Sequence, residues 1–201
     1  MASPRGRPVS VPPVGSLLVV TGPPGAGKST TARLLACDDR LGGERVRSAI
    51  VSGDDFFSCL VRGAIEPWNP GSELQNDVVI EAAATCAGLF ARGGYATVYD
   101  GVVGPWYLEA FARATGLDRL GYAILLPSLE RCVRQVHDRL NHGFRNEQAT
   151  RDLHAQFARS EIDPRHRVID PPEDPREVVD LVLDGASSGR FTYEVGHSPQ
   201  R

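Results

Sequence analysis

The sequence is poor in features that mark several other classes of protein. It contains a single lysine, and its formal net charge is -3 with a pI near 6.0. Proteins that neutralise nucleic-acid phosphates usually carry a basic face, so this charge balance makes a nucleic-acid partner unlikely. The four cysteines show no C-x-x-C spacing, and the sequence therefore indicates neither a zinc site nor a disulfide framework.

Long apolar runs are also missing. No stretch is long enough to span a bilayer, and residues 1–15 contain prolines where a signal peptide has an uninterrupted hydrophobic segment. We therefore expect a soluble, cytoplasmic protein without a membrane partner. The composition, 41% hydrophobic and 23% charged, suits one globular domain, which we place at residues 16–186. Residues 1–15 and 187–201 are predicted to be flexible tails.

A glycine-rich stretch organises the rest of the prediction. Residues 22–29, Gly-Pro-Pro-Gly-Ala-Gly-Lys-Ser, fit the G-x-x-x-x-G-K-[ST] pattern of a phosphate-binding loop, or P-loop. In such a loop, glycines let backbone N–H groups surround a polyphosphate, the lysine supplies a cation and the serine hydroxyl binds Mg²⁺. The residues expected to hold ATP are Gly22, Pro23, Pro24, Gly25, Ala26, Gly27, Lys28, Ser29 and Thr30.

The context of this stretch supports the motif. Residues 17–21 are apolar and partly β-branched, which predicts a buried strand, and residues 30–37 have the pattern of a helix. Strand, loop and helix in this order place the loop at a helix N-terminus, where anions bind well. The only lysine of the chain, Lys28, stands where phosphate contact requires one. Further strands are predicted at 46–52, 95–100, 120–126 and 165–170.

Acidic residues follow two of the predicted strands. Asp54 and Asp55 come directly after residues 46–52, and Asp100 ends residues 95–100. The carboxyl ends of parallel strands form a ligand crevice, so Asp54 and Asp55 are candidates for acid–base catalysis on an acceptor. A solvated turn or helix cap is the alternative. Asp100 occupies the place of a carboxylate that holds Mg²⁺ through water, and we expect it to bind metal with Ser29 and to lie near the acceptor.

Both tryptophans follow prolines. Trp68 and Trp106 are predicted to lie in loops at the same sheet edge, where they would form an apolar, partly aromatic acceptor pocket. An equally good interpretation is that they pack helices onto the sheet.

Arginines concentrate in a later segment. Eight of them lie between residues 131 and 167, and residues 128–160 have the pattern of two helices with a break near residue 143. Because phosphoryl transfer spreads charge over the equatorial phosphate oxygens, arginines on a lid would assist it. We expect Arg134 and Arg139 to clamp the transferring group. Ordinary charge on a helix surface is the alternative.

Taken together, residues 16–185 resemble the small P-loop kinases of the nucleoside-monophosphate-kinase-like group. This group includes gluconate kinase, chloramphenicol phosphotransferase, zeta toxins and the kinase domain of polynucleotide kinase. The resemblance implies a three-layer α/β fold with a five-stranded parallel sheet, helices on both faces and a helical lid that bears arginines. It also implies ATP and Mg²⁺ as cosubstrates, and phosphoryl transfer to a hydroxyl group.

The resemblance extends to single residues. Asp54 matches the base that takes the acceptor proton in polynucleotide kinase, whereas Asp55 matches better the Asp that precedes Phe in gluconate kinase. We favour Asp54. The family often has two lid arginines four residues apart, but here Gln135 stands four before Arg139, and Arg134 is the substitute.

The sequence therefore predicts an ATP-dependent kinase with a small-molecule hydroxyl acceptor. One alternative is a nucleotide-binding switch or ATPase module that uses the same loop without an acceptor. Another is a polynucleotide 5′-kinase, which the net charge of -3 disfavours. Neither the identity of the acceptor nor the oligomeric state follows from the sequence.

Overall fold

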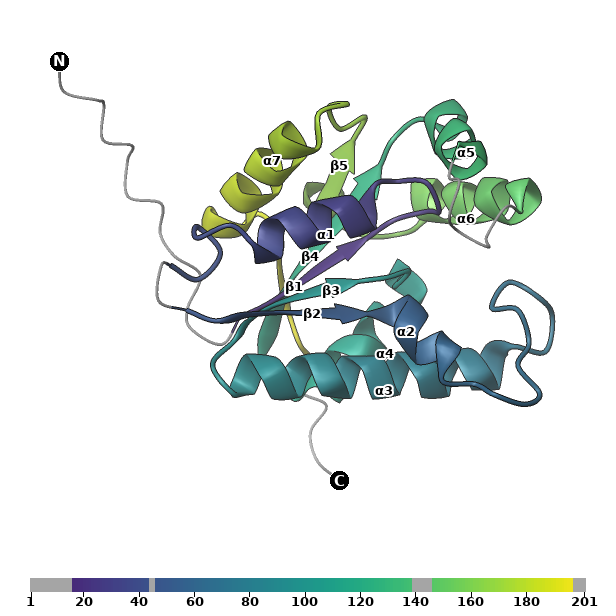
Figure 1. The fold of residues 1–201 in the computed structure, drawn as a ribbon, viewed down its shortest axis with the longest axis horizontal. Coiled ribbons are helices and arrows are strands. Elements are labelled where there is room, and N and C mark those ends of the chain that lie inside the picture. Colours follow the sequence, from purple (N-terminus) through teal and green to yellow (C-terminus); the bar gives the residue numbers. More distant parts are fainter. Residues whose placement is uncertain (1–15, 44–45, 139–145, 197–201) are drawn as a thin grey trace, which may run out of the picture.

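The computed structural model describes residues 16–43, 46–138 and 146–196, and its centre is a parallel sheet (Figure 1). The strand order is β2-β3-β1-β4-β5, so the strand that precedes the P-loop is central. This arrangement confirms the predicted five-stranded parallel sheet. The strands are β1 (Leu17–Thr21), β2 (Ser48–Ser52), β3 (Ala96–Asp100), β4 (Arg119–Leu126) and β5 (Arg167–Ile169).

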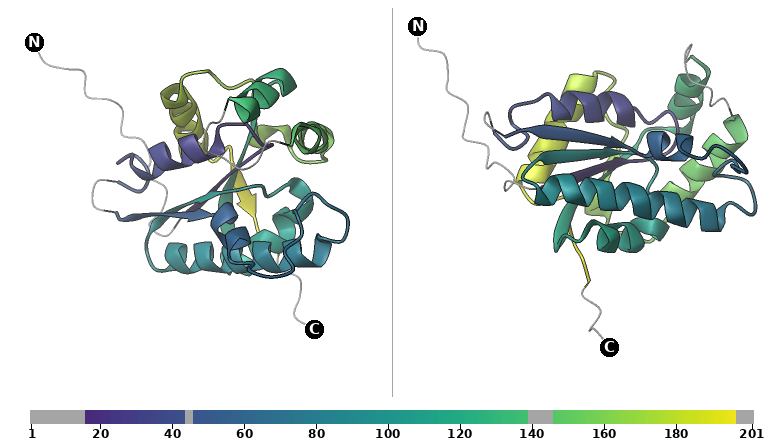
Figure 2. Two further views of the ribbon diagram at one scale, coloured as in Figure 1. Left: turned by 45° about the vertical axis from the view of Figure 1, so that its right-hand side comes forward. Right: turned by 60° about the horizontal axis from the view of Figure 1, so that its bottom comes forward.

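Helices cover both faces of the sheet (Figures 1 and 2). Alternate residues of β1 enter two cores: Leu17 and Val19 pack on one face, and Leu18 and Val20 on the other. A strand buried on both faces reads as a continuous apolar run, which is why β1 was evident from the sequence. The first face is covered by α3 (Glu73–Arg92) and α4 (Pro105–Thr115), and the second by α1 (Lys28–Ala36) and α7 (Pro175–Ser187).

The remaining helices lie around the carboxyl end of the sheet. Figure 1 shows α2 (Gly53–Ser58) directly after β2, and α5 (Leu129–His137) and α6 (Glu147–Arg159) beside the P-loop. A short 3₁₀ helix, η1 (Pro164–His166), precedes β5. The helices α2 and α4 were not predicted, and Trp106 therefore lies in the first turn of a helix rather than in a loop.

The end of the chain differs from the prediction. A sixth strand, β6 (Thr192–Glu194), pairs antiparallel with β4, and Phe191 beside it is fully buried. The prediction of a flexible tail from residue 187 is therefore wrong as far as residue 196. The segment escaped notice because three residues are too few to establish an alternating pattern. Residues 1–15 and 197–201 lie outside the described residues.

Within the described ranges, no helix is both long enough and apolar enough to cross a membrane.

Candidate active site

The P-loop lies between β1 and α1 and owes its shape to three glycines. Gly22, Gly25 and Gly27 have φ values of 146°, 78° and 86°, which residues with a Cβ rarely adopt. A Cβ on Gly25 would collide with the carbonyl of Cys132 in α5, so α5 packs directly on the loop. At Gly27, in contrast, a Cβ would meet nothing within 4 Å. The loop is thus tightly packed against α5 at Gly25 and open at Gly27, as a phosphate-binding loop requires.

Helix α1 presents its N-terminus at this loop. It begins at Lys28 and has no side-chain cap, so N–H groups of its first turn are available to an anion. The Lys28 Nζ donates a hydrogen bond to the Pro23 carbonyl at 2.9 Å, which folds the ammonium group over the loop. Thr30 lies exposed in the same turn. These groups fit a triphosphate, which needs backbone donors and one cation.

Ser29 and Asp100 meet beside the P-loop. The parallel register pairs Val20 with Asp100, and the Ser29 hydroxyl donates a hydrogen bond to the Asp100 carboxylate. Burial raises the pKa of Asp100 above its ordinary value, although the Ser29 hydrogen bond and the Lys28 charge oppose this rise. A hydroxyl and a carboxylate are oxygen ligands of the kind that Mg²⁺ prefers.

These two residues would hold Mg²⁺ together with nucleotide phosphates. In the described ranges there is no group of three or more His, Cys, Asp or Glu side chains that could bind a metal. Mg²⁺ commonly takes one or two carboxylates and completes its shell with phosphate oxygens and water, so Ser29 and Asp100 fit that mode.

Of the two aspartates that follow β2, Asp54 is the one whose charge acts on this site. Ser52 of β2 pairs with Asp100 of β3, so α2 starts next to the backbone of Asp100. The charge of Asp54 contributes to the raised pKa values of Asp100 and of the buried Tyr99, behind burial as the main cause. Asp55 is not among the charges that act on either group. Both aspartates are exposed, and which of them meets an acceptor stays a prediction.

A buried clamp that we did not predict holds the loop after β3. The Thr21 hydroxyl donates to the Val103 carbonyl at 3.1 Å and accepts from the Val103 N–H at 2.9 Å. The Tyr122 hydroxyl donates to the same carbonyl at 2.6 Å. The loop that leaves Asp100 is therefore fixed to both β1 and β4. No sequence signal marks this clamp, because Thr21 and Val103 are 82 residues apart.

The two tryptophans occupy different settings. Trp106 is 46% exposed, and its ring packs against the buried Phe157 of α6 at a centroid distance of 5.3 Å. Trp68 is 37% exposed and lies in the loop of residues 59–72. Gln75 fastens this loop through two hydrogen bonds to the backbone of Ile65, at 2.8 and 2.7 Å. Whether either tryptophan touches an acceptor stays a prediction.

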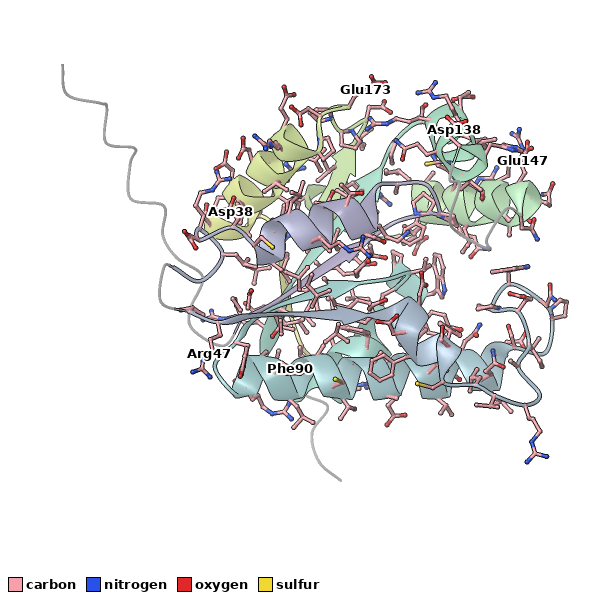
Figure 3. All side chains as sticks on the ribbon, in the orientation of Figure 1. Asp38, Arg47, Phe90, Asp138, Glu147 and Glu173 are labelled. Carbon is pink, nitrogen blue, oxygen red and sulfur yellow. The ribbon has the colours of Figure 1, made fainter. Side chains whose placement is uncertain are left out.

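Two arginines of α5, Arg131 and Arg134, have structural partners. Arg131 donates to the carbonyls of Pro171 and Pro172, which fastens α5 to the loop after β5. Arg134 forms an exposed ion pair with Glu173 of that loop at 3.7 Å. Figure 3 shows Glu173 on this loop and Glu147 on α6, both around the P-loop end of the molecule. Arg139 lies outside the described residues.

No protein-family profile matches the sequence, and no curated protein matches it. Solved structures do match: a gluconokinase from Sinorhizobium meliloti aligns with a TM-score of 0.58 at 18% identity, over 88% of this chain and 94% of its own. This chain has the fold of the small P-loop kinases. The Mycobacterium tuberculosis APS kinase, in complex with AMPPNP and APS, aligns with a TM-score of 0.63 at 18% identity, over 86% and 98% of the two chains.

A third P-loop kinase-like match is a component of the Pnkp1/Rnl/Hen1 RNA repair complex. It aligns with a TM-score of 0.55 at 16% identity, over 76% of this chain and 47% of its own. At such identities the matches show the fold, and the roles of single residues rest on the geometry described above.

Proposed function

We propose that this chain is a kinase that transfers the γ-phosphoryl group of ATP to a hydroxyl group of a small molecule. The observation that carries the proposal is the meeting of Lys28, Ser29, Asp54 and Asp100 at the carboxyl end of the central strands. A cation, a metal-binding pair and an outward carboxylate are the groups that phosphoryl transfer needs. The names of two structural neighbours, gluconokinase and APS kinase, are those of kinases with small-molecule acceptors.

The proposed step assigns one task to each residue. The backbone of the P-loop and Lys28 would hold the β- and γ-phosphates, and Ser29 and Asp100 would hold Mg²⁺, which would neutralise phosphate charge. Asp54 accepts the proton of the acceptor hydroxyl, and the oxygen of that hydroxyl forms a bond to the γ-phosphorus. The bond between that phosphorus and the β,γ-bridging oxygen breaks, and ADP leaves. Arg134 and Arg139 assist from the lid, and Trp68 and Trp106 border the acceptor.

The aspartate pair supplies a matched test. The wild type, Asp54→Asn and Asp55→Asn are incubated with γ-labelled ATP, Mg²⁺ and a panel of sugars, amino sugars, sugar acids, nucleosides and amino alcohols. We expect labelled product with the wild type and Asp55→Asn, and a loss of about 100-fold or more with Asp54→Asn. Equal losses in both variants would reject Asp54 as the base. Label in free phosphate alone, with no change in Asp54→Asn, would favour a nucleotide switch.

Nucleotide binding is tested separately from transfer. Because Lys28 is the only lysine of the chain, an amine-selective reagent modifies only Lys28 and the α-amino group. Mg·ATP should protect Lys28 from modification, read by mass spectrometry of the peptide that contains it. Unprotected Lys28 at saturating ATP would contradict the assignment of the P-loop.

A polynucleotide acceptor is the second candidate, since one structural neighbour belongs to an RNA repair complex. The net charge of -3 opposes it, because strand binding normally requires a basic surface. Labelling of a 5′-hydroxyl oligonucleotide, with affinity that falls steeply as salt rises, would favour this candidate over a small molecule.

A further inference from the structure

Two glycines stand next to the aspartates of the candidate site, one beside each. Gly53 directly precedes Asp54, and Gly101 directly follows Asp100. Neither glycine has a positive φ, so the backbone conformation does not require glycine at these positions. What a Cβ would meet there explains both of them, because in each case it would meet the side chain of Tyr99.

The phenol of Tyr99 contacts both glycines. A Cβ on Gly53 would lie 2.6 Å from the Tyr99 hydroxyl oxygen. A Cβ on Gly101 would lie 2.8 Å from Cε1 and 2.9 Å from the hydroxyl oxygen of the same ring. These separations are well below van der Waals contact, which for carbon atoms is about 3.5–4.0 Å. The ring therefore touches the first residue of α2 and the first residue of the loop after β3.

The core holds this ring in place. Tyr99 is 2% exposed, and on β3 it is in register with Val19 of β1 and Val51 of β2. Its ring packs edge-to-face against Phe111 of α4, with a centroid distance of 4.8 Å. Protein cores are close-packed and transmit displacements instead of absorbing them. The segments that touch the hydroxyl end of the ring are therefore held at a fixed distance from the sheet.

The electrostatics agree with this placement. Burial is the main cause that raises the pKa of Tyr99 above its ordinary value, and the negative charges of Asp54 and Asp100 raise it further. The phenol is therefore neutral at physiological pH, and it acts on its neighbours through its size.

We infer that Tyr99 is a positioning residue of the proposed reaction, because its phenol sets the separation between Asp54 and Asp100. The proposed transfer gives these carboxylates different tasks, one at the acceptor hydroxyl and one at Mg²⁺. Their separation therefore decides whether the attacking oxygen lies in line with the γ-phosphorus. Phenylalanine would fill the same place in the core, but only the hydroxyl oxygen of tyrosine reaches Gly53. The inference rests on the proposed kinase function.

The contacts predict which of two glycine variants a second substitution rescues. Gly53→Ala places a methyl group against the hydroxyl oxygen, whereas the next ring atom, Cζ, is 3.4 Å away, which is an ordinary contact. Tyr99→Phe removes that oxygen and makes room for the methyl group. The methyl group of Gly101→Ala would still meet Cε1 at 2.8 Å. Tyr99→Phe should therefore rescue Gly53→Ala and leave Gly101→Ala impaired.

Steady-state kinetics measure the rescue, with γ-labelled ATP, Mg²⁺ and the member of the acceptor panel that the wild type labels fastest. We expect Gly53→Ala to lower kcat by about 10-fold to 100-fold, since a displacement of about 1 Å at a reacting group has that effect. The KM for ATP should stay within about twofold of the wild type, because the P-loop is untouched. The double variant should recover to within about threefold of Tyr99→Phe alone.

A second tyrosine supplies the control for the loss of a hydroxyl group. The ring of Tyr95 lies beside Phe90, at the far end of α3 from the candidate site (Figure 3). Tyr95→Phe should therefore keep the kcat of the wild type. Circular dichroism and urea denaturation establish that each variant is folded. If Gly53→Ala does not fold, the double variant decides: a kcat more than about tenfold below that of Tyr99→Phe would overturn the inference.

The other outcomes separate positioning from stability and from the kinase function. If the double variant recovers the free energy of unfolding but not kcat, Tyr99 is only structural and the inference is overturned. A wild-type kcat in Gly53→Ala, or equal rescue of both glycine variants, would overturn it as well. In all these cases the wild type still labels an acceptor, so the kinase function stands. Label in free phosphate alone, from the wild type with every acceptor, would overturn the kinase function and with it this role of Tyr99.

Discussion

At the scale of single residues, glycines of the P-loop are required for two reasons: a left-handed backbone conformation and close packing against α5. Gly25 needs a left-handed backbone and also lets α5 approach, because a Cβ there would meet the Cys132 carbonyl. Gly27 needs the backbone conformation alone, since the space beside it is open. One glycine thus serves the packing of the protein, and the other leaves room for a ligand.

A pair of glycine variants measures the packing demand. Gly25 and Gly63 have similar φ values of 78° and 73°, but a Cβ on Gly63 would meet nothing within 4 Å. Gly63→Ala should lower the free energy of unfolding by about 1–2 kcal/mol, the cost of a Cβ in left-handed backbone. Gly25→Ala should cost clearly more, because the Cys132 carbonyl must also move. Urea denaturation measures both. Equal losses would show that α5 does not pack tightly on the loop.

Asp100 is predicted to lower the free energy of unfolding at neutral pH, although its carboxylate is a proposed ligand of the metal. Its folded-state pKa is raised, so the carboxyl favours folding only while protonated, and that contribution is lost as the pH rises through the folded pKa. At neutral pH the buried charge therefore destabilises the apo protein. We expect Asp100→Asn to raise the free energy of unfolding at pH 7 by the order of 1 kcal/mol, with a smaller gain near pH 4. Denaturation at both pH values measures the gain.

The control for Asp100→Asn is the thermal stabilisation that Mg·ATP gives to the wild type and to the variant. The wild type should gain thermal stability from Mg·ATP, whereas the variant should gain less, because it lacks a carboxylate for the metal. A variant that is less stable than the wild type at pH 7 would contradict the expected sign.

The residues of the candidate site were partly predictable for a physical reason. Asp100 ends β3, and Asp54 follows two residues after the end of the adjacent parallel strand β2, so the topology places both at the same edge of the sheet. The clamp of Thr21, Val103 and Tyr122 follows no such rule. Its members lie on different elements and meet only because the side chains of β1 and β4 face the loop after β3.

At the scale of elements, the long periodic helices and buried strands were predictable, whereas the short elements were not. The six residues of α2 hold too few turns to show a helical period, and β6 has three residues. The helix α4 does carry signals, since Pro105 starts it and Gly116 ends it with a left-handed φ of 64°. Pro105 and Trp106 are nevertheless expected in a loop from the sequence, although proline is favoured at the first position of a helix.

The loop of residues 59–72 is predicted to depend on one glutamine of α3. The Gln75 side chain accepts from the Ile65 N–H and donates to the Ile65 carbonyl, so it mimics a strand partner for the loop. Gln75→Ala should lower the free energy of unfolding by only about 1 kcal/mol. It should nevertheless speed trypsin cleavage after Arg62, the only basic residue of the loop, because local opening governs cleavage.

The measurement is the rate of appearance of the Arg62 fragment by mass spectrometry. Gln156→Ala, on the exposed surface of α6, is the matched control. Trypsin should cleave it after Arg62 at the wild-type rate. If trypsin also cleaves Gln75→Ala at the wild-type rate, the loop is held by its other contacts, such as the hydrogen bond from the Ser72 hydroxyl to the Pro67 carbonyl.

At the scale of the whole molecule, the candidate site connects segments that are distant in the sequence. The P-loop touches β4 at Leu125 and α5 at Cys132, and α5 is in turn fastened to the loop after β5. A ligand that fixes the P-loop therefore restrains more than its own contacts. Thermodynamic linkage sets the size of the effect: a ligand at 100 times its Kd stabilises the fold by roughly 2.7 kcal/mol.

Hydrogen exchange tests this connection. Mg·ATP should slow amide exchange in the P-loop and also in α5, because Gly25 packs against the Cys132 carbonyl and opening of either segment requires movement of the other. The far end of α3, where Figure 3 shows Phe90, should change little and serves as the internal control. Lys28→Ala should remove the protection from both segments, since it weakens the phosphate contact on which both depend. Protection confined to the P-loop and α1 would mean that α5 is packed against the site without being coupled to it.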